Sequence, residues 1–141
     1  MLLVYNVPNK PTSGRLFVWR KLKKLGALLL HDSVWVLPAT THTREQLRWL
    51  ASEIEELDGE ATVWEARQAL ASDEEKLIAR FEEAVEGPYR ELLAELKRKG
   101  RDLAVLSRRF QQVQSQDYFQ SQLGQRVRET LLAAAAKGDR P

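Results

Sequence analysis

The chain has 141 residues, of which 22 are basic and 20 acidic, giving a formal net charge of +2, and 43% are hydrophobic. This length supports one hydrophobic core, and the composition is that of a globular rather than a disordered chain. Because there is no cysteine, a disulfide framework, a thiolate zinc site and a cysteine nucleophile are excluded.

Nothing in the sequence predicts export or membrane insertion. The N-terminus lacks the basic region followed by a long apolar run that an export signal requires. No apolar stretch is long enough to cross a bilayer. We therefore expect a cytoplasmic protein with no membrane partner.

The charges are segregated along the chain. Residues 1–50 carry eight bases and two acids, residues 51–96 fourteen acids and four bases, and residues 97–141 ten bases and four acids. Such separation suits a phosphate-binding surface or a head-to-tail contact. The alternative is that charged helices simply solvate their outer faces.

The first elements in the chain are a strand and a helix. Leu2–Val7 is an apolar run ended by a proline, which predicts a buried strand. A helix is expected from Arg15 to Leu25, capped by Thr12 or Ser13, and Gly26 ends it.

Three more strands and a helix are predicted next. Strands at Ala27–Leu30 and Val34–Leu37 flank a tight turn. Thr43 and Gln46 form an expected capping box for a second helix, and Ala61–Ala66 predicts a fourth strand. The order βαββαβ is the split βαβ pattern of a ferredoxin-like sandwich.

The fold class is therefore expected to be α+β. A ferredoxin-like domain is predicted for residues 1–68, a helical extension packed on it for residues 69–136, and a flexible tail for residues 137–141. The sheet face that the two helices leave open favours a homodimer.

The helical half has its own predicted boundaries. Ser72 and Glu75 form an expected capping box, the helix ends at Gly87, and Pro88 starts the next one. An apolar seam with 3-4-3 spacing, typical of intramolecular or dimer packing, follows at Leu103, Leu106, Phe110 and Val113.

The best candidate for a functional surface is the helix at residues 15–25. Trp19 and Leu22 are expected to fix one side of it to the sheet. The other side can follow DNA phosphates without reading sequence, or it is a solvated face. The basic side chains expected there, from their spacing of three and four residues or beside it, are Arg15, Arg20, Lys21, Lys23 and Lys24.

A second basic cluster surrounds Gly100. Arg101 and Arg108 are seven residues apart and are expected to align, with Arg109 beside them. This cluster could contact DNA or hold an oxyanion, which needs convergent guanidinium or N–H donors. The alternative is a polar helix face with cations near a helix C-terminus. The full cluster is Lys97, Arg98, Lys99, Arg101, Arg108 and Arg109.

No set of side chains predicts catalysis. His31 and His42 lack metal-ligand spacing with an acid, and no Ser/His/Asp set is indicated. We therefore expect no enzyme, no metal and no cofactor.

The tryptophans are expected in the core. All four lie in the first half of the chain, at Trp19, Trp35, Trp49 and Trp64. The alternative considered for Trp35 is a stacking platform for nucleobases.

Three runs carry a family resemblance: WRKLKKLGA (Trp19–Ala27), HDSVWVLP (His31–Pro38) and QDYF (Gln116–Phe119). They resemble the N-terminal domain of the chromate-resistance regulator ChrB. The resemblance implies a role in transcriptional control of chromate resistance, and it makes chromate the oxyanion that the second basic cluster could hold. Members of that family usually continue into a second domain, which is not expected within these residues.

Residues 1–66 also resemble, more distantly, the ferredoxin-like domains of Cas2 and VapD proteins and a domain of PaaX-type repressors. Cas2 nucleases place an aspartate just after the first strand, where paired subunits present two carboxylates to a divalent ion. The matching position here is Asn6, and an amide is a poorer Mg²⁺ ligand than a carboxylate. The nuclease mechanism is therefore not implied.

These observations predict a ChrB-like DNA-binding regulator or accessory protein. A Cas2/VapD-like, metal-dependent nuclease is one alternative, in which Asp32 would replace the missing carboxylate. A module that binds a separately encoded partner is the other.

Overall fold

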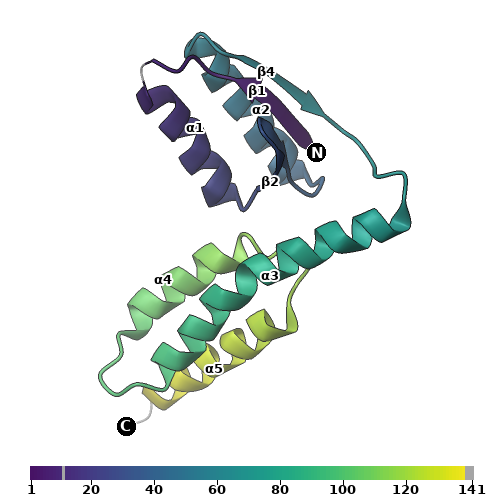
Figure 1. Ribbon diagram of the computed structural model, residues 1–141. Coiled ribbons are helices and arrows are strands. Elements are labelled where there is room, and N and C mark those ends of the chain that lie inside the picture. Colours follow the sequence, from purple (N-terminus) through teal and green to yellow (C-terminus); the bar gives the residue numbers. More distant parts are fainter. Residues whose placement is uncertain (11, 139–141) are drawn as a thin grey trace. The chain divides into compact units, whose positions relative to one another are not determined.

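The computed structural model describes residues 1–10 and 12–138 and divides the chain into two compact units. We call Met1–Ala69 the sheet unit and the residues from Leu70 onward the helical unit (Figure 1). A small antiparallel sheet followed by a helical half confirms the predicted mixture of strands and helices. No helix within the two described ranges combines the length and the apolar character needed to span a membrane.

The sheet unit follows the order βαββαβ. Its four strands form one sheet in the order β2-β3-β1-β4, and every neighbouring pair is antiparallel. In this register Leu3 lies opposite Trp35 on one side and Val63 on the other. The elements are β1 Leu2–Asn6, α1 Thr12–Leu25, β2 Leu28–His31, β3 Val34–Val36, α2 Thr41–Glu56 and β4 Glu60–Trp64.

The core of the sheet unit lies between its helices and one face of the sheet. α2 packs against β1 and β4, and α1 packs against α2. Each large apolar side chain removed from water contributes about 1.5–3 kcal/mol. Those buried almost completely are Leu3, Val18, Leu22, Leu47, Leu50 and Ile54.

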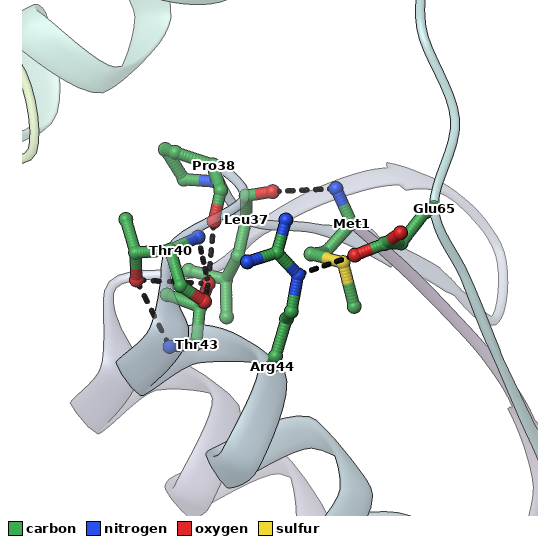
Figure 2. A network of polar contacts seen from close by, with 7 residues as sticks. All are labelled: Met1, Leu37, Pro38, Thr40, Thr43, Arg44 and Glu65. Carbon is green, nitrogen blue, oxygen red and sulfur yellow. Dashed lines mark hydrogen bonds and ion pairs between the residues drawn. The ribbon is translucent and has the colours of Figure 1, made fainter.

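Two threonines fix the start of α2 (Figure 2). Thr40 is the N-cap: its Oγ1 accepts a hydrogen bond from the Thr43 backbone N at 3.0 Å, and Thr43 Oγ1 accepts one from the Thr40 backbone N at 2.9 Å. The buried Thr43 hydroxyl donates to the Pro38 carbonyl at 2.6 Å. The predicted capping box of Thr43 and Gln46 is therefore wrong, because the N-cap is Thr40, three residues earlier.

Near the start of α2, polar contacts also hold the N-terminus of the chain and the segment after β4 (Figure 2). The Met1 amino group donates to the Leu37 carbonyl at 2.9 Å, and the Arg44 guanidinium pairs with Glu65. The hydrogen bond from Arg44 lowers the pKa of the Glu65 carboxyl. Glu65 thus ties the segment after β4 to α2.

The helical unit is a bundle of three helices: α3 Ala71–Leu96, α4 Leu103–Gln114 and α5 Gln122–Gly138. Each helix packs against the other two. The apolar seam of α4 faces this core, which confirms that it packs within the molecule. The core comprises Val85, Tyr89, Leu92, Leu96, Leu106, Phe110, Val127 and Leu131.

The two ends of the helical unit differ from the predicted boundaries. α3 has its N-cap at Leu70, without a side-chain hydrogen bond, so the capping box of Ser72 and Glu75 is wrong. α5 reaches Gly138, so the first two residues of the predicted tail are helical, and residues 139–141 lie outside the described residues.

α3 also runs without interruption through Gly87 and Pro88, where the sequence predicts a break. A proline within a helix removes one backbone hydrogen bond and costs about 3 kcal/mol. The buried side chains Val85 and Tyr89 continue one stripe on both sides of it, and their burial offsets this cost.

The QDYF run connects α3 to α5. The Tyr89 hydroxyl donates to Asp117 Oδ2 at 2.8 Å, and the Ser121 backbone N donates to the same carboxylate at 3.0 and 3.1 Å. The rings of Tyr118 and Phe119 lie 6.1 and 5.9 Å from that of Phe81, centroid to centroid. The run is therefore a structural clasp within the helical unit.

This clasp makes the stability of the helical unit sensitive to alkaline pH. Burial and the nearby Asp117 carboxylate raise the pKa of Tyr89, whereas an unfolded tyrosine ionises near pH ~10. The stabilisation is therefore complete below that pH and is lost as the pH rises above it.

We expect Tyr89→Phe to reduce this alkaline loss of stability. The variant also loses about 1–3 kcal/mol at neutral pH, because the hydrogen bond to a charged partner is gone. Denaturant unfolding followed by circular dichroism from neutral to alkaline pH measures both effects. Tyr118→Phe serves as the comparison variant. Burial raises the pKa of Tyr118 as well, but Asp117 contributes only to the raised pKa of Tyr89. A pH profile unchanged in Tyr89→Phe would contradict the prediction.

Candidate nucleic-acid interface

The orientation of α1 is set by the side that it buries. The buried residues of this helix are Gly14, Val18 and Leu22, which recur every fourth position and therefore share one side. A Cβ at Gly14 would lie 3.5 Å from Val7 Cγ1 and 3.7 Å from a Leu57 methyl. These are ordinary van der Waals distances, so this end of α1 lies against Val7 and Leu57.

The exposed surface of α1 is basic. The helix carries five bases and no acid, and all five basic side chains are exposed, including the predicted Arg15, Arg20, Lys21 and Lys24. The Arg15 guanidinium donates from Nη1 to Asn9 Oδ1 at 2.7 Å, which directs it along the loop before the helix. The structure thus exposes all four residues predicted in this helix. Arg20, Lys21 and Lys24 share one exposed side, whereas Arg15, nine residues before Lys24, lies about 180° from Lys24 around the helix axis.

Aromatic side chains interrupt this basic surface, and the sequence did not predict them there. Trp19 is 48% exposed and Phe17 37%, so the expectation that Trp19 fixes α1 to the sheet is wrong. Lys23 Nζ lies 5.8 Å from the centroid of the Trp19 ring, and Lys21 Nζ lies 5.7 Å from that of Phe17. Each exposed ring therefore has an ammonium group beside it.

The other tryptophans also differ from the prediction. Only Trp35 is buried, which removes it as a stacking platform, whereas Trp49 is 72% exposed and Trp64 is largely exposed. The Trp64 indole donates from Nε1 to Thr62 Oγ1 at 2.8 Å on the same strand. Aromatic residues available for stacking are thus those that the sequence assigned to the core.

The second basic cluster is less uniform than its sequence suggests. Arg101 precedes Asp102, the N-cap of α4, so it is not in helical register with Arg108 and the predicted alignment is wrong. Arg108 is exposed. Arg109 pairs with Glu95 and lies 4.0 Å from Glu91, so its charge is already balanced within the bundle.

The position of the nuclease aspartate is occupied by Asn6, at the end of β1. Its cross-strand partner in β4 is Glu60, a carboxylate that sequence reasoning missed because the register is not encoded locally. Asp32 lies in the β2–β3 turn, 3.3 Å from the His31 imidazole. Among the described residues, no group of three or more histidine, aspartate or glutamate side chains could hold a metal ion.

Comparison with known proteins gives two matches. Residues 15–98 match the family model described as "Protein ChrB, N-terminal", a range from the start of α1 to just beyond α3 that excludes the QDYF run. The protein ChrB of Cupriavidus metallidurans is 31% identical over 96 residues, which cover 68% of this chain and 29% of that protein. No solved structure matches the chain.

The chain thus spans less than a third of its curated relative. The matched range nevertheless includes the whole exposed basic surface of α1 and more than half of the residues. On this match, the chain belongs to the family of the N-terminal domain of protein ChrB.

Proposed function

We propose that this protein binds DNA in the transcriptional control of chromate resistance and that it performs no catalysis. Family membership supports the link to chromate resistance. The observation that carries DNA binding is α1, where Val18 and Leu22 are buried and every basic side chain is exposed. Such a helix can neutralise successive phosphates. The proposal places the protein in the cytoplasm.

The second basic cluster contributes less to this proposal. Arg101 and Arg108 are candidates for further phosphate contacts. Arg109 is a poorer candidate, because Glu91 and Glu95 hold its guanidinium. Chromate as an effector bound by these arginines stays a prediction, and equilibrium dialysis with chromate would measure it.

We further infer that the sheet unit is a ferredoxin-like sandwich and that it forms a homodimer. The strand order β2-β3-β1-β4 with antiparallel neighbours supports the first inference. The sheet face that alternates with Leu3 and Trp35 carries Leu2, Val4 and Trp64, and such an apolar face supports the second. Sedimentation equilibrium of the full chain measures its mass in solution.

An electrophoretic mobility shift with the promoter of the protein's own operon tests DNA binding. We expect the affinity to fall steeply with salt, because phosphate contacts release counterions. Lys21→Glu with Lys24→Glu should weaken binding about tenfold or more and reduce the salt slope by roughly two, one for each lysine. Promoter binding that is unchanged in this variant would contradict the proposal.

The matched control is Lys76→Glu with Lys137→Glu. Both lysines are exposed and lie in the helical unit, and the change in net charge is the same. Retained binding in this control separates the contribution of α1 from net charge.

The two alternatives have distinct outcomes in the same assay. Mg²⁺-dependent cleavage of the DNA that disappears in Asp32→Asn or Glu60→Gln would support the nuclease. Co-purification of a second protein without any DNA binding would support the interaction module.

A further inference from the structure

We propose that α1 binds single-stranded DNA in preference to duplex DNA, with the rings of Phe17 and Trp19 stacking on unpaired bases. This inference rests on the proposed function and specifies its substrate. Proteins that bind single strands combine a cationic groove for the backbone with aromatic side chains on which bases stack. The exposed surface of α1 contains both components.

Leaving these apolar side chains exposed has a cost in free energy. Leu16 is 42% exposed, in addition to Phe17 and Trp19, on a helix whose other exposed side chains include five bases. A helix that only follows phosphates needs no aromatic residue, and apolar surface left in water forgoes the stabilisation of burial. The exposed rings are therefore better explained by a ligand with flat apolar faces.

The two rings lie close to the positive charges of α1. Residues two positions apart on a helix differ by about 200° around its axis, so Phe17 and Trp19 lie on either side of Arg20. Lys21 and Lys23 lie within 6 Å of the two ring centroids. Each ammonium group lies over a ring, so a base that stacks on that face displaces it, and the displaced ammonium group is then close to the phosphate of that base.

Duplex DNA is a poorer ligand for these rings than a single strand. In a duplex the base faces are covered by their neighbours and must be unstacked at a cost before a side chain can reach them. In a single strand they are accessible. The rings therefore add affinity for single strands, while the basic side chains add affinity for both forms.

A basic helix with exposed aromatic residues is also typical of binding to a membrane surface. Such binding requires one continuous apolar face. In α1 Gly14, Val18 and Leu22 are buried in the sheet unit. On the exposed surface Arg20 and Lys24 lie between Phe17 and the pair Leu16 and Trp19, so the exposed apolar side chains form no continuous face. Nucleic acid is therefore the favoured ligand.

Fluorescence anisotropy of the full chain with a labelled oligonucleotide, single-stranded and as a duplex of the same sequence, tests the inference. We expect Phe17→Ala with Trp19→Ala to weaken single-strand binding about tenfold or more and duplex binding less than twofold. The aromatic-retaining variant Phe17→Tyr with Trp19→Phe should bind nearly as the unchanged protein. Trp49→Ala is the control, because this exposed tryptophan lies on α2.

The outcomes separate this inference from the proposed function. If the alanine variant loses single-strand and duplex binding equally, or neither, stacking is overturned while DNA binding stands. If Lys21→Glu with Lys24→Glu changes neither, DNA binding by α1 itself fails. Binding of the full chain to vesicles containing phosphatidylglycerol, with no binding to either DNA, would also overturn the inference.

Discussion

Gly124→Val is expected to unfold the helical unit while the sheet unit stays folded. A Cβ at Gly124 would lie 2.8 Å from Asp117 Oδ2 and from two ring atoms of Tyr89. Tyr89 is completely buried, so its ring must shift away from its core contacts to make room.

The expected loss is large because two effects add. Overpacking of a core costs about 1–3 kcal/mol, and displacing the Tyr89 hydroxyl from Asp117 costs about 1.5–3 kcal/mol for a hydrogen bond to a charged group. Together they approach the total stability of a small domain, roughly 5 kcal/mol.

The distribution of tryptophan makes this loss measurable unit by unit. All four tryptophans lie in the sheet unit and none in the helical unit. Tryptophan emission therefore follows the sheet unit. Far-ultraviolet circular dichroism follows the helices of both units, α1 and α2 as well as α3, α4 and α5. We expect Gly124→Val to lose helical signal with the native emission retained.

Gly138→Val, at the other end of α5, is the matched control. A Cβ there meets no atom within 4 Å, so its stability should change by less than about 0.5 kcal/mol. Full helicity in Gly124→Val would contradict the close packing of α5 on Tyr89. Loss of tryptophan emission in that variant would contradict independent folding of the units.

The order of elements could be predicted from the sequence because its signals are local. The apolar runs of the strands and the 3-4-3 spacing of α4 are set by residues within a few positions of each other. The exact boundaries could not. Thr40 and Thr43 are both suitable N-caps, and the buried bond from Thr43 to the Pro38 carbonyl decides between them.

The break predicted at Gly87 and Pro88 shows the same limit. Both residues disfavour a helix interior, and local preference alone ends the helix there. The contact of α3 with α4 and α5 depends on residues far along the chain, and this packing keeps the helix continuous.

The candidate site was predictable in its charges and not in its aromatic residues. Basic side chains are rarely buried without a partner, so the exposure of those in α1 follows from their type. The pairing of Arg109 with Glu95 joins two helices and leaves no signal at either position in the sequence.

The position of Trp19 could not be predicted because α1 contains two apolar stripes. One includes Leu16, Trp19 and Leu22, and the other Val18 and Leu22. Both share Leu22, so spacing alone does not choose between them. The second stripe, with Gly14, is the buried one, and its contacts with other segments, such as that of Gly14 with Leu57, leave no signal within the helix.

Val18→Asp is therefore expected to unfold the sheet unit, whereas Leu16→Asp is not. Val18 is 0% exposed, and an unpaired carboxylate in that place must either lose its hydration or bind a proton, at a cost of several kcal/mol. Leu16 is on the exposed side, where a new carboxylate stays hydrated. The two variants share the helix, the introduced residue and the change in net charge, so only the orientation of α1 separates them. Tryptophan emission during denaturant unfolding measures the difference.

Both DNA proposals require this orientation of α1. Rotating the helix to bury Leu16 and Trp19 would remove the Trp19 ring from the exposed surface and change the direction in which the basic side chains point. Greater destabilisation by Leu16→Asp would contradict them together.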